Sequence, residues 1–164
     1  IRGGLLYHTL SIIRLAEGVC RLYPAVDRDL LMCGIIVHDL CKIDEFEISS
    51  AGLASGYSVK GELIGHLVMG AMKIEMKAKE LGISEGTAML LQHMVISHHG
   101  DPEFGAAVRP MFLEAEILSE LDKLDATINI YTKLWIQFLV ELLNIQLMEF
   151  MQQFLQTFPS CQFS

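Results

Sequence analysis

The stretch LLMCGIIVHDL, residues 30–40, decides how the rest of the chain is interpreted. Its first eight residues are continuously apolar, and Asp27, three positions earlier, suits the N-cap of a helix. Periodicity alone does not separate such a run from a buried strand. Because the segments on both sides carry apolar residues at helical spacing, we interpret the stretch as a buried helix that ends on His38 and Asp39.

Helical patterning continues outward from this stretch in both directions. Further helices are predicted over residues 5–23, 61–81, 84–99 and 111–158, the last with a break near Asn129. Residues 44–60 and 101–110 are rich in Gly, Ser or Pro and are predicted to be loops. The predicted fold class is therefore all-α: one domain over residues 1–164, with a helical bundle as its core (about 3–129) and a long C-terminal helical segment (about 130–158).

The composition excludes several classes of protein. Apolar residues make up 52% of the 164 residues and the mean hydropathy is +0.40, which rules out intrinsic disorder. A net charge of −8 without a Lys/Arg-rich run leaves no broad basic surface for nucleic acid. No stretch of about 18 uncharged apolar residues occurs, so we expect no membrane span.

The four cysteines, Cys20, Cys33, Cys41 and Cys161, show no paired spacing. Two of them flank the apolar run, where reduced buried thiols are the usual interpretation. We therefore expect a reducing, cytoplasmic location.

The histidines are the chemically informative residues. Five of the six lie on apolar helix faces or at their ends: His8, His38, His66, His98 and His99. A single buried neutral imidazole needs only a hydrogen-bond partner. Five such imidazoles, with an aspartate directly after one of them, indicate a shared metal ion. Imidazole with carboxylate suits Mn, Fe, Co, Ni or Zn.

The last helix offers the acidic partner. Glu116, Glu120 and Lys123 mark its solvent-facing stripe, whereas Asp122 and Asp125 fall on the opposite, inward side. An inward carboxylate is costly to bury unless a cation compensates it. Periodicity does not choose between the two aspartates.

The ordered series of these residues resembles the HD superfamily of metal-dependent phosphohydrolases. Four words of the sequence sharpen the resemblance towards YhaM-type 3′-to-5′ exoribonucleases: HDLCKI (38–43), GELIGH (61–66), HMVISHHG (93–100) and LDKLDA (121–126). The resemblance covers about residues 3–129. The sequence departs from the family at Cys41, where the family usually has glycine. The OB-fold that precedes the HD domain in these exonucleases is not among its residues. We expect such an OB-fold upstream of this chain.

The resemblance implies a seven-residue ligand set for one or two divalent ions, with Mn preferred. The set is His8, His38, Asp39, His66, His98, His99 and Asp122, in which Asp39 bridges the two ions and Asp125 supports a ligand. Catalytic roles fall to Asp39, His98 and Lys42, the last facing the substrate phosphate.

Three further residues are assigned weaker roles. Arg109 and Tyr57 are expected to touch the substrate, the former because it lies in the loop after the paired histidines. His93 is expected either to belong to the core or to support the ligands from behind, since it lies five residues before His98, a poor spacing for sharing a helix face.

The resemblance implies a phosphodiesterase that hydrolyses RNA 3′ ends with a metal-activated hydroxide. The alternatives are a phosphohydrolase of small nucleotides or cyclic dinucleotides, and a non-catalytic, metal-stabilised regulatory domain. The apolar residues of the C-terminal segment exceed what one amphipathic face needs, so we also expect it to form a homo-oligomer interface.

Overall fold

The computed structural model describes residues 3–49 and 52–157, with side chains as far as Phe154. Cys161 lies outside the described residues. The elements follow one another as α1 (Gly4–Leu22), α2 (Arg28–Val37), α3 (Lys42–Glu45), β1 (Phe46–Ile48), β2 (Ala54–Tyr57), α4 (Val59–Leu63), α5 (Gly65–Leu81), α6 (Glu85–Ser97), the 3-10 turn η1 (Pro102–Phe104) and α7 (Leu113–Thr157). Residues 1–125 form one compact unit and residues 126–164 a second.

Capping residues define several helix ends, and the N-cap predicted at Asp27 is confirmed. The side chain of Asp27 accepts a hydrogen bond from the backbone N–H of Leu30 at 3.0 Å, which caps α2. Ser84 caps α6 in the same way through the N–H of Thr87. Gly82 ends α5 with a φ of 66°, a left-handed conformation that favours glycine.

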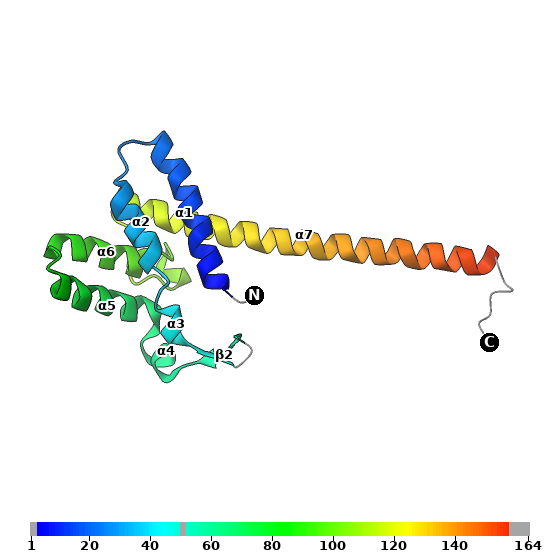
Figure 1. Cartoon of the computed structure of the whole chain (residues 1–164), viewed down its shortest axis with the longest axis horizontal. Coiled ribbons are helices and arrows are strands. Elements are labelled where there is room, and N and C mark those ends of the chain that lie inside the picture. The colour runs from blue at the N-terminus through cyan, green and yellow to red at the C-terminus, as the bar shows by residue number, and fades with distance from the viewer. Residues whose placement is uncertain (1–2, 50–51, 158–164) are drawn as a thin grey trace. The chain divides into compact units, whose positions relative to one another are not determined.

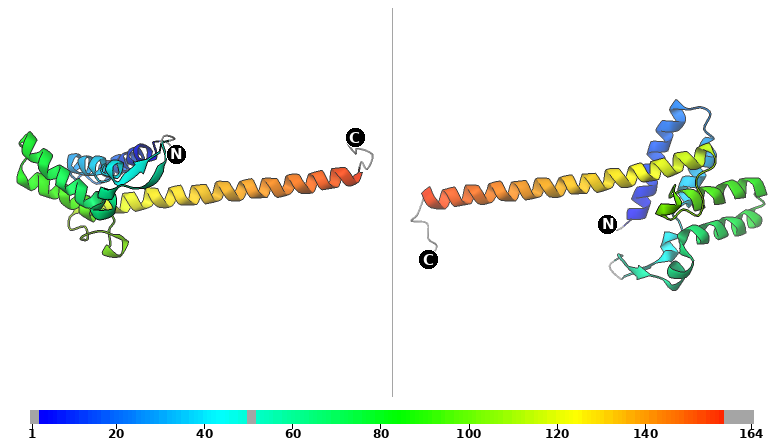
Figure 2. Two further views of the ribbon diagram at one scale, coloured as in Figure 1. Left: turned by 90° about the horizontal axis from the view of Figure 1, so that it is seen from below. Right: turned by 180° about the vertical axis from the view of Figure 1, so that it is seen from behind.

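The core of the first unit lies where α1, α2, α6 and the first turns of α7 meet (Figure 1). Its fully buried side chains include Ile12, Leu31, Ile35, Met94 and Leu118. The helices α5 and α6 pack along each other, as both views in Figure 2 show. Because α2 also packs on α6, the C-terminal ends of these two helices reach the same region of the bundle.

The prediction of a loop over residues 44–60 is wrong in detail. This segment contains the end of α3, a two-stranded antiparallel hairpin and the start of α4. The predicted helix over residues 61–81 is also interrupted, because Gly65 adopts a φ of 74° between α4 and α5. These short elements escape a periodicity argument, since a strand of three or four residues shows too few repeats to register. The all-α class holds for the bundle, with this small hairpin added.

The predicted break near Asn129 is also wrong, because α7 is continuous over Leu113–Thr157. In the second unit its large apolar side chains are exposed, among them Trp135, Phe138 and Leu143. The helix is long and apolar enough to cross a membrane by length and composition, with an 18-residue window of mean hydropathy 1.3. The sequence criterion missed this window because it allowed no charged residue. Length and composition do not separate a membrane helix from one that packs on another protein chain.

Candidate metal centre

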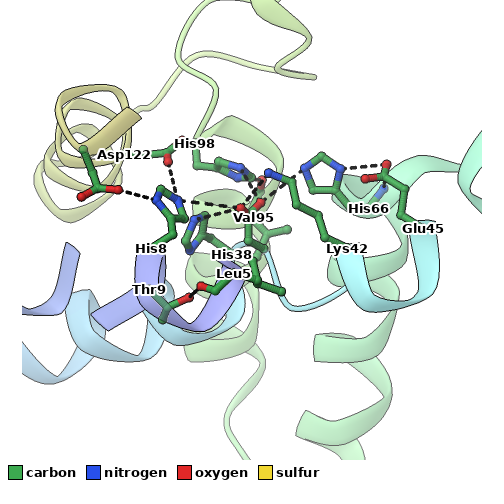
Figure 3. A network of polar contacts seen from close by, with 12 residues as sticks. Leu5, His8, Thr9, His38, Lys42, Glu45, His66, Val95, His98 and Asp122 are labelled. Atoms are coloured by element: carbon green, nitrogen blue, oxygen red, sulfur yellow. Dashed lines mark hydrogen bonds and ion pairs between the residues drawn. The ribbon is translucent and has the colours of Figure 1, made fainter. Parts of the chain in front are cut away.

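Two histidines terminate helices of the core in the same way. His38 is the C-cap residue of α2 and His98 that of α6. Each ring donates its Nδ1 proton to the backbone carbonyl three residues earlier, of Ile35 and Val95 respectively, at 2.7 Å. Nδ1 of each ring is therefore engaged, and Nε2 faces the interior, as Figure 3 shows for His98 and His38. The helix ends thus hold the two imidazoles in fixed orientations.

A buried glutamate orients the third imidazole. The carboxylate of Glu45 accepts hydrogen bonds from both the backbone N–H and the Nδ1 atom of His66, at 3.0 and 2.9 Å (Figure 3). Glu45 is itself held at the end of α3, where the N–H of Ser58 donates to its carbonyl oxygen. Because Nδ1 is engaged, Nε2 of His66 faces the other rings as a potential ligand.

Two aspartates of α7 flank the fourth imidazole. Oδ2 of Asp125 lies 2.7 Å from Nδ1 of His8, and Oδ1 of Asp122 lies 2.9 Å from Nε2 of the same ring. The pKa of His8 rises to about 9, chiefly through the hydrogen bond with Asp122 and against the effect of burial. Asp125 therefore supports the ring from behind, and Asp122 lies on the same side as the other candidate ligand atoms. The structure separates the two roles that periodicity left open.

Asp39 lies at the centre of the cluster, and its two oxygens face different histidines. Oδ2 lies 3.6 Å from Nε2 of His38 and 3.9 Å from Nε2 of His8, whereas Oδ1 lies 3.4 Å from Nε2 of His98 and 3.6 Å from Nε2 of His66. A carboxylate in this position is suited to bridge two cations.

The donor atoms fit divalent ions by a direct structural test. Among the described residues, five buried polar atoms have no hydrogen-bond partner: Nε2 of His38, His66 and His98, Nδ1 of His99 and Oδ1 of Asp39. Such orphaned buried groups are costly unless something binds them. Two ligands of one ion at about 2.0–2.1 Å from it lie about 3 to 3.5 Å apart, close to the separations observed here.

The candidate ligand atoms group in threes. Each group has its atoms within 4.8 Å of one another: His66 with His98 and His99, His8 with His38 and Asp39, and His38 with His98 and Asp122. The first two groups together contain six of the seven residues that the family resemblance implies as ligands. The third group joins His98 of the first group to His38 of the second, so the two groups are neighbours.

The protonation states favour metal binding at most of these positions. Burial lowers the pKa of His38 and that of His99 to about 4, so both rings are neutral near pH 7. Burial alone would raise the pKa of Asp39, but His98, His38 and Lys42 lower it well below its usual range. The centre therefore combines neutral imidazoles with an ionised carboxylate, the ligand forms that a divalent metal requires.

Three further residues predicted for the site are not candidate metal ligands, and their positions differ. Nζ of Lys42 lies at the centre but donates to Oδ2 of Asp39 at 2.7 Å. Arg109 pairs with Asp101 at the rim of a cavity that His99 also lines. Tyr57 is exposed on β2, where its ring packs on Phe46 at 4.8 Å.

His93 does not contact the ligand cluster, contrary to the supporting role, one of the two expected for it. Its Nε2 atom accepts a hydrogen bond from the N–H of Met111, and its ring packs on Phe112. Burial lowers its pKa, which favours this neutral, accepting form. His93 therefore anchors the loop before α7 to α6.

Glu45 was not predicted as a site residue from the sequence. It was expected in a loop, although a carboxylate seven positions after His38 could have prompted the question of a supporting role. Glu114 is buried, and its carboxylate accepts a hydrogen bond from the N–H of Asp27 at 2.7 Å. It therefore ties α7 to the start of α2, away from the metal ligands.

Comparison with known proteins assigns the class. A model of the HD domain family matches residues 5–127, and the chain belongs to this family. The proteins it resembles include 3′-5′ exoribonuclease YhaM of Bacillus licheniformis, at 46% identity, of Bacillus pumilus, at 47%, and of Bacillus subtilis, at 43%. Each match extends over 126 residues, or 77% of this chain and 39% of the relative, so the chain spans about two fifths of the length of these relatives. No solved structure matches it.

Proposed function

We propose that the chain is the catalytic part of a metal-dependent phosphodiesterase that acts on the 3′ end of single-stranded RNA. The observation that carries this proposal is the convergence of unpartnered Nε2 atoms from three helices on both oxygens of Asp39. The similarity to 3′-5′ exoribonucleases suggests the substrate. Manganese is the preferred ion because of the family resemblance, and Fe, Co, Ni or Zn would also suit a mixed imidazole and carboxylate set.

Charge explains how an acidic chain could bind an anion at this site. Two divalent ions would bring four positive charges, against two negative charges from Asp39 and Asp122. An imidazole that binds a metal ion is neutral and subtracts nothing. The centre would therefore attract phosphate although the chain carries a net charge of −8.

The residues divide the work of the reaction. When bound, the ions supply a coordinated water of lowered pKa and positive charge for the phosphate. Backbone carbonyls and Glu45 hold the imidazoles as Nδ1–H tautomers, so their Nε2 atoms need not reorient. Lys42 is about one-third exposed, so its ammonium group is within reach of a phosphate bound beside Asp39.

The direct test is hydrolysis by the metal-stripped protein on addition of Mn²⁺. We expect 5′-labelled single-stranded RNA to shorten one nucleotide at a time from its 3′ end. We expect Asp39→Asn to abolish both Mn²⁺ binding and hydrolysis, and Asp29→Asn, an exposed carboxylate on the adjacent helix, to leave them unchanged. Hydrolysis that persists in Asp39→Asn would contradict the assignment of the site.

A second candidate function is hydrolysis of small nucleotides or cyclic dinucleotides. The acidic net charge favours it, because small substrates need no basic surface to bind. A panel of nucleotides assayed beside the RNA distinguishes the two functions by their kcat/KM values. A chain that binds Mn²⁺ tightly and turns over no substrate would instead support a regulatory, metal-stabilised domain.

A reducing, cytoplasmic location is part of the same proposal. Cys20, Cys33 and Cys41 are free thiols, which supports it. An OB-fold domain upstream stays a prediction.

A further inference from the structure

Two cavities lie beside the metal centre and share three lining residues. Their volumes are about 400 and 310 Å³, and both are lined by His99, Phe104 and Lys123. The smaller is also lined by His98 and Asp122, which are candidate metal ligands. Both volumes fall within the range of small-molecule sites, about 300–1,000 Å³. A group bound there would therefore be continuous with a phosphate at the metal centre.

Phe104 has an unusual position in these cavities. It ends η1, its side chain is 74% exposed, and it lines both cavities. The turn continues through Gly105, whose φ of 97° favours glycine, and a Cβ atom added to Gly105 would lie 3.5 Å from Nδ1 of His99. An aromatic ring in this position adds nothing to the buried core, but it offers a flat apolar face next to the ligands.

The loop that carries Phe104 is held at several points. Arg109 donates two hydrogen bonds to the carboxylate of Asp101, at 2.9 and 3.1 Å. The N–H of Ala107 donates to the carbonyl of Ile96 in α6, and His93 accepts the N–H of Met111. These contacts fix the position of the loop before any ligand binds, which lowers the entropy lost on binding.

We propose that Phe104 is the stacking platform for an unpaired nucleobase of the substrate whose phosphate lies at the metal centre. This inference rests on the proposed function. Bases of single-stranded nucleic acids stack on aromatic side chains largely without regard to sequence, whereas a paired base has its faces covered. The exposed ammonium group of Lys123, at the rim of both cavities, lies where the sugar-phosphate of that nucleotide would pass.

Stacking has a spectroscopic signature that a structural role would not produce. The probe is a short RNA with 2-aminopurine as its 3′-terminal base and a phosphorothioate at the last linkage, which slows hydrolysis. With Zn²⁺, which does not quench by paramagnetism, we expect the wild-type protein to quench the 2-aminopurine fluorescence. We expect Phe104→Ala to lose the quenching and Phe104→Tyr to retain it.

The second readout is the change in kcat/KM of hydrolysis when the 3′-terminal base is removed. For the wild-type protein we expect kcat/KM on RNA to fall about tenfold when the 3′-terminal nucleotide is abasic. In Phe104→Ala the intact and abasic RNAs should be hydrolysed equally well. Met76→Ala, which removes an exposed apolar side chain from α5, is the matched control and should behave as wild type.

The outcomes separate this inference from the proposed function. Hydrolysis of RNA with an unchanged base preference and unchanged quenching in Phe104→Ala would overturn the role of Phe104 and leave the function standing. Quenching that depends on Phe104, without hydrolysis of any RNA, would overturn the function and leave the base site standing. 2-Aminopurine riboside 5′-monophosphate shows whether a free nucleotide suffices for the stacking. Equal melting temperatures of the variants confirm that the loop mutations leave the fold intact.

Discussion

At the scale of single residues, Glu45 has a role that its exposed neighbours do not share. Its carboxylate holds both the backbone and the ring of His66. Interactions that orient a ligand from behind typically account for a 10–100-fold difference in metal affinity. The orientation of His66 therefore depends on Glu45, which is not itself one of the candidate metal ligands.

We predict that Glu45→Gln lowers the affinity for the metal about 10–100-fold. The amide can accept the backbone N–H but loses the negative charge that strengthens the bond to Nδ1. Isothermal titration of the stripped protein with Mn²⁺ or Zn²⁺ measures the change directly. Glu47→Gln, an exposed glutamate two residues away, is the control. Equal affinities for Glu45→Gln and wild type would remove Glu45 from the site.

His8 provides the pH-dependent prediction. In the metal-free protein its pKa is raised to about 9, first by Asp122 and also by Asp125. A raised folded pKa means that its stabilisation is complete below the unfolded value, about 6.5, and is lost as the pH rises through 9. Titration of the ring by NMR should show the raised value, and Asp122→Asn should lower it more than Asp125→Asn. A pKa near 6.5 would contradict the arrangement of the two aspartates.

At the scale of elements, the hairpin and the short helices α3 and α4 position Glu45. Gly61 in α4 lies directly against α3, where an added Cβ atom would lie 2.2 Å from the backbone carbonyl oxygen of Glu45. Backbone cannot move aside as a flexible side chain can. The close approach of α3 and α4 therefore requires glycine at this position.

We predict that Gly61→Ala destabilises the fold by about 1–3 kcal/mol, the usual cost of overpacking. It should also weaken metal binding, because the shifted carbonyl carries Glu45 with it. Thermal unfolding with and without metal measures both effects. Gly86→Ala is the matched control: nothing lies within 4 Å of its added Cβ atom, and it should stabilise α6 by up to about 1 kcal/mol. A neutral Gly61→Ala would contradict the close contact.

At the scale of the whole molecule, the two units carry different features. The candidate ligands and the core cluster belong to residues 1–125. The second unit carries exposed aromatic and aliphatic side chains, among them Trp135, Phe138 and Phe150. Exposed apolar surface of this extent is typical of an interface with another protein chain or with a membrane.

We predict that the full chain self-associates and that a chain of residues 1–129 does not. Light scattering coupled to size-exclusion chromatography compares the two at micromolar concentration. The short chain should still bind Mn²⁺, because it retains all seven candidate ligands. A monomeric full chain would end the homo-oligomer hypothesis, and partition of the full chain into lipid vesicles would point to a membrane instead.

The sequence by itself predicted the helical bundle and the histidines that gather in it, and its resemblance to the HD superfamily supplied the full set of candidate ligands. Those features follow from local patterns: apolar spacing, capping residues such as Asp27 and Ser84, and histidines at apolar helix ends. Only the tertiary structure showed how Asp122 and Asp125 lie around His8 and revealed Glu45, because both observations depend on distances between segments far apart in the chain. It also placed Phe104 beside the metal centre, since the course of a loop depends on hydrogen bonds to elements outside it.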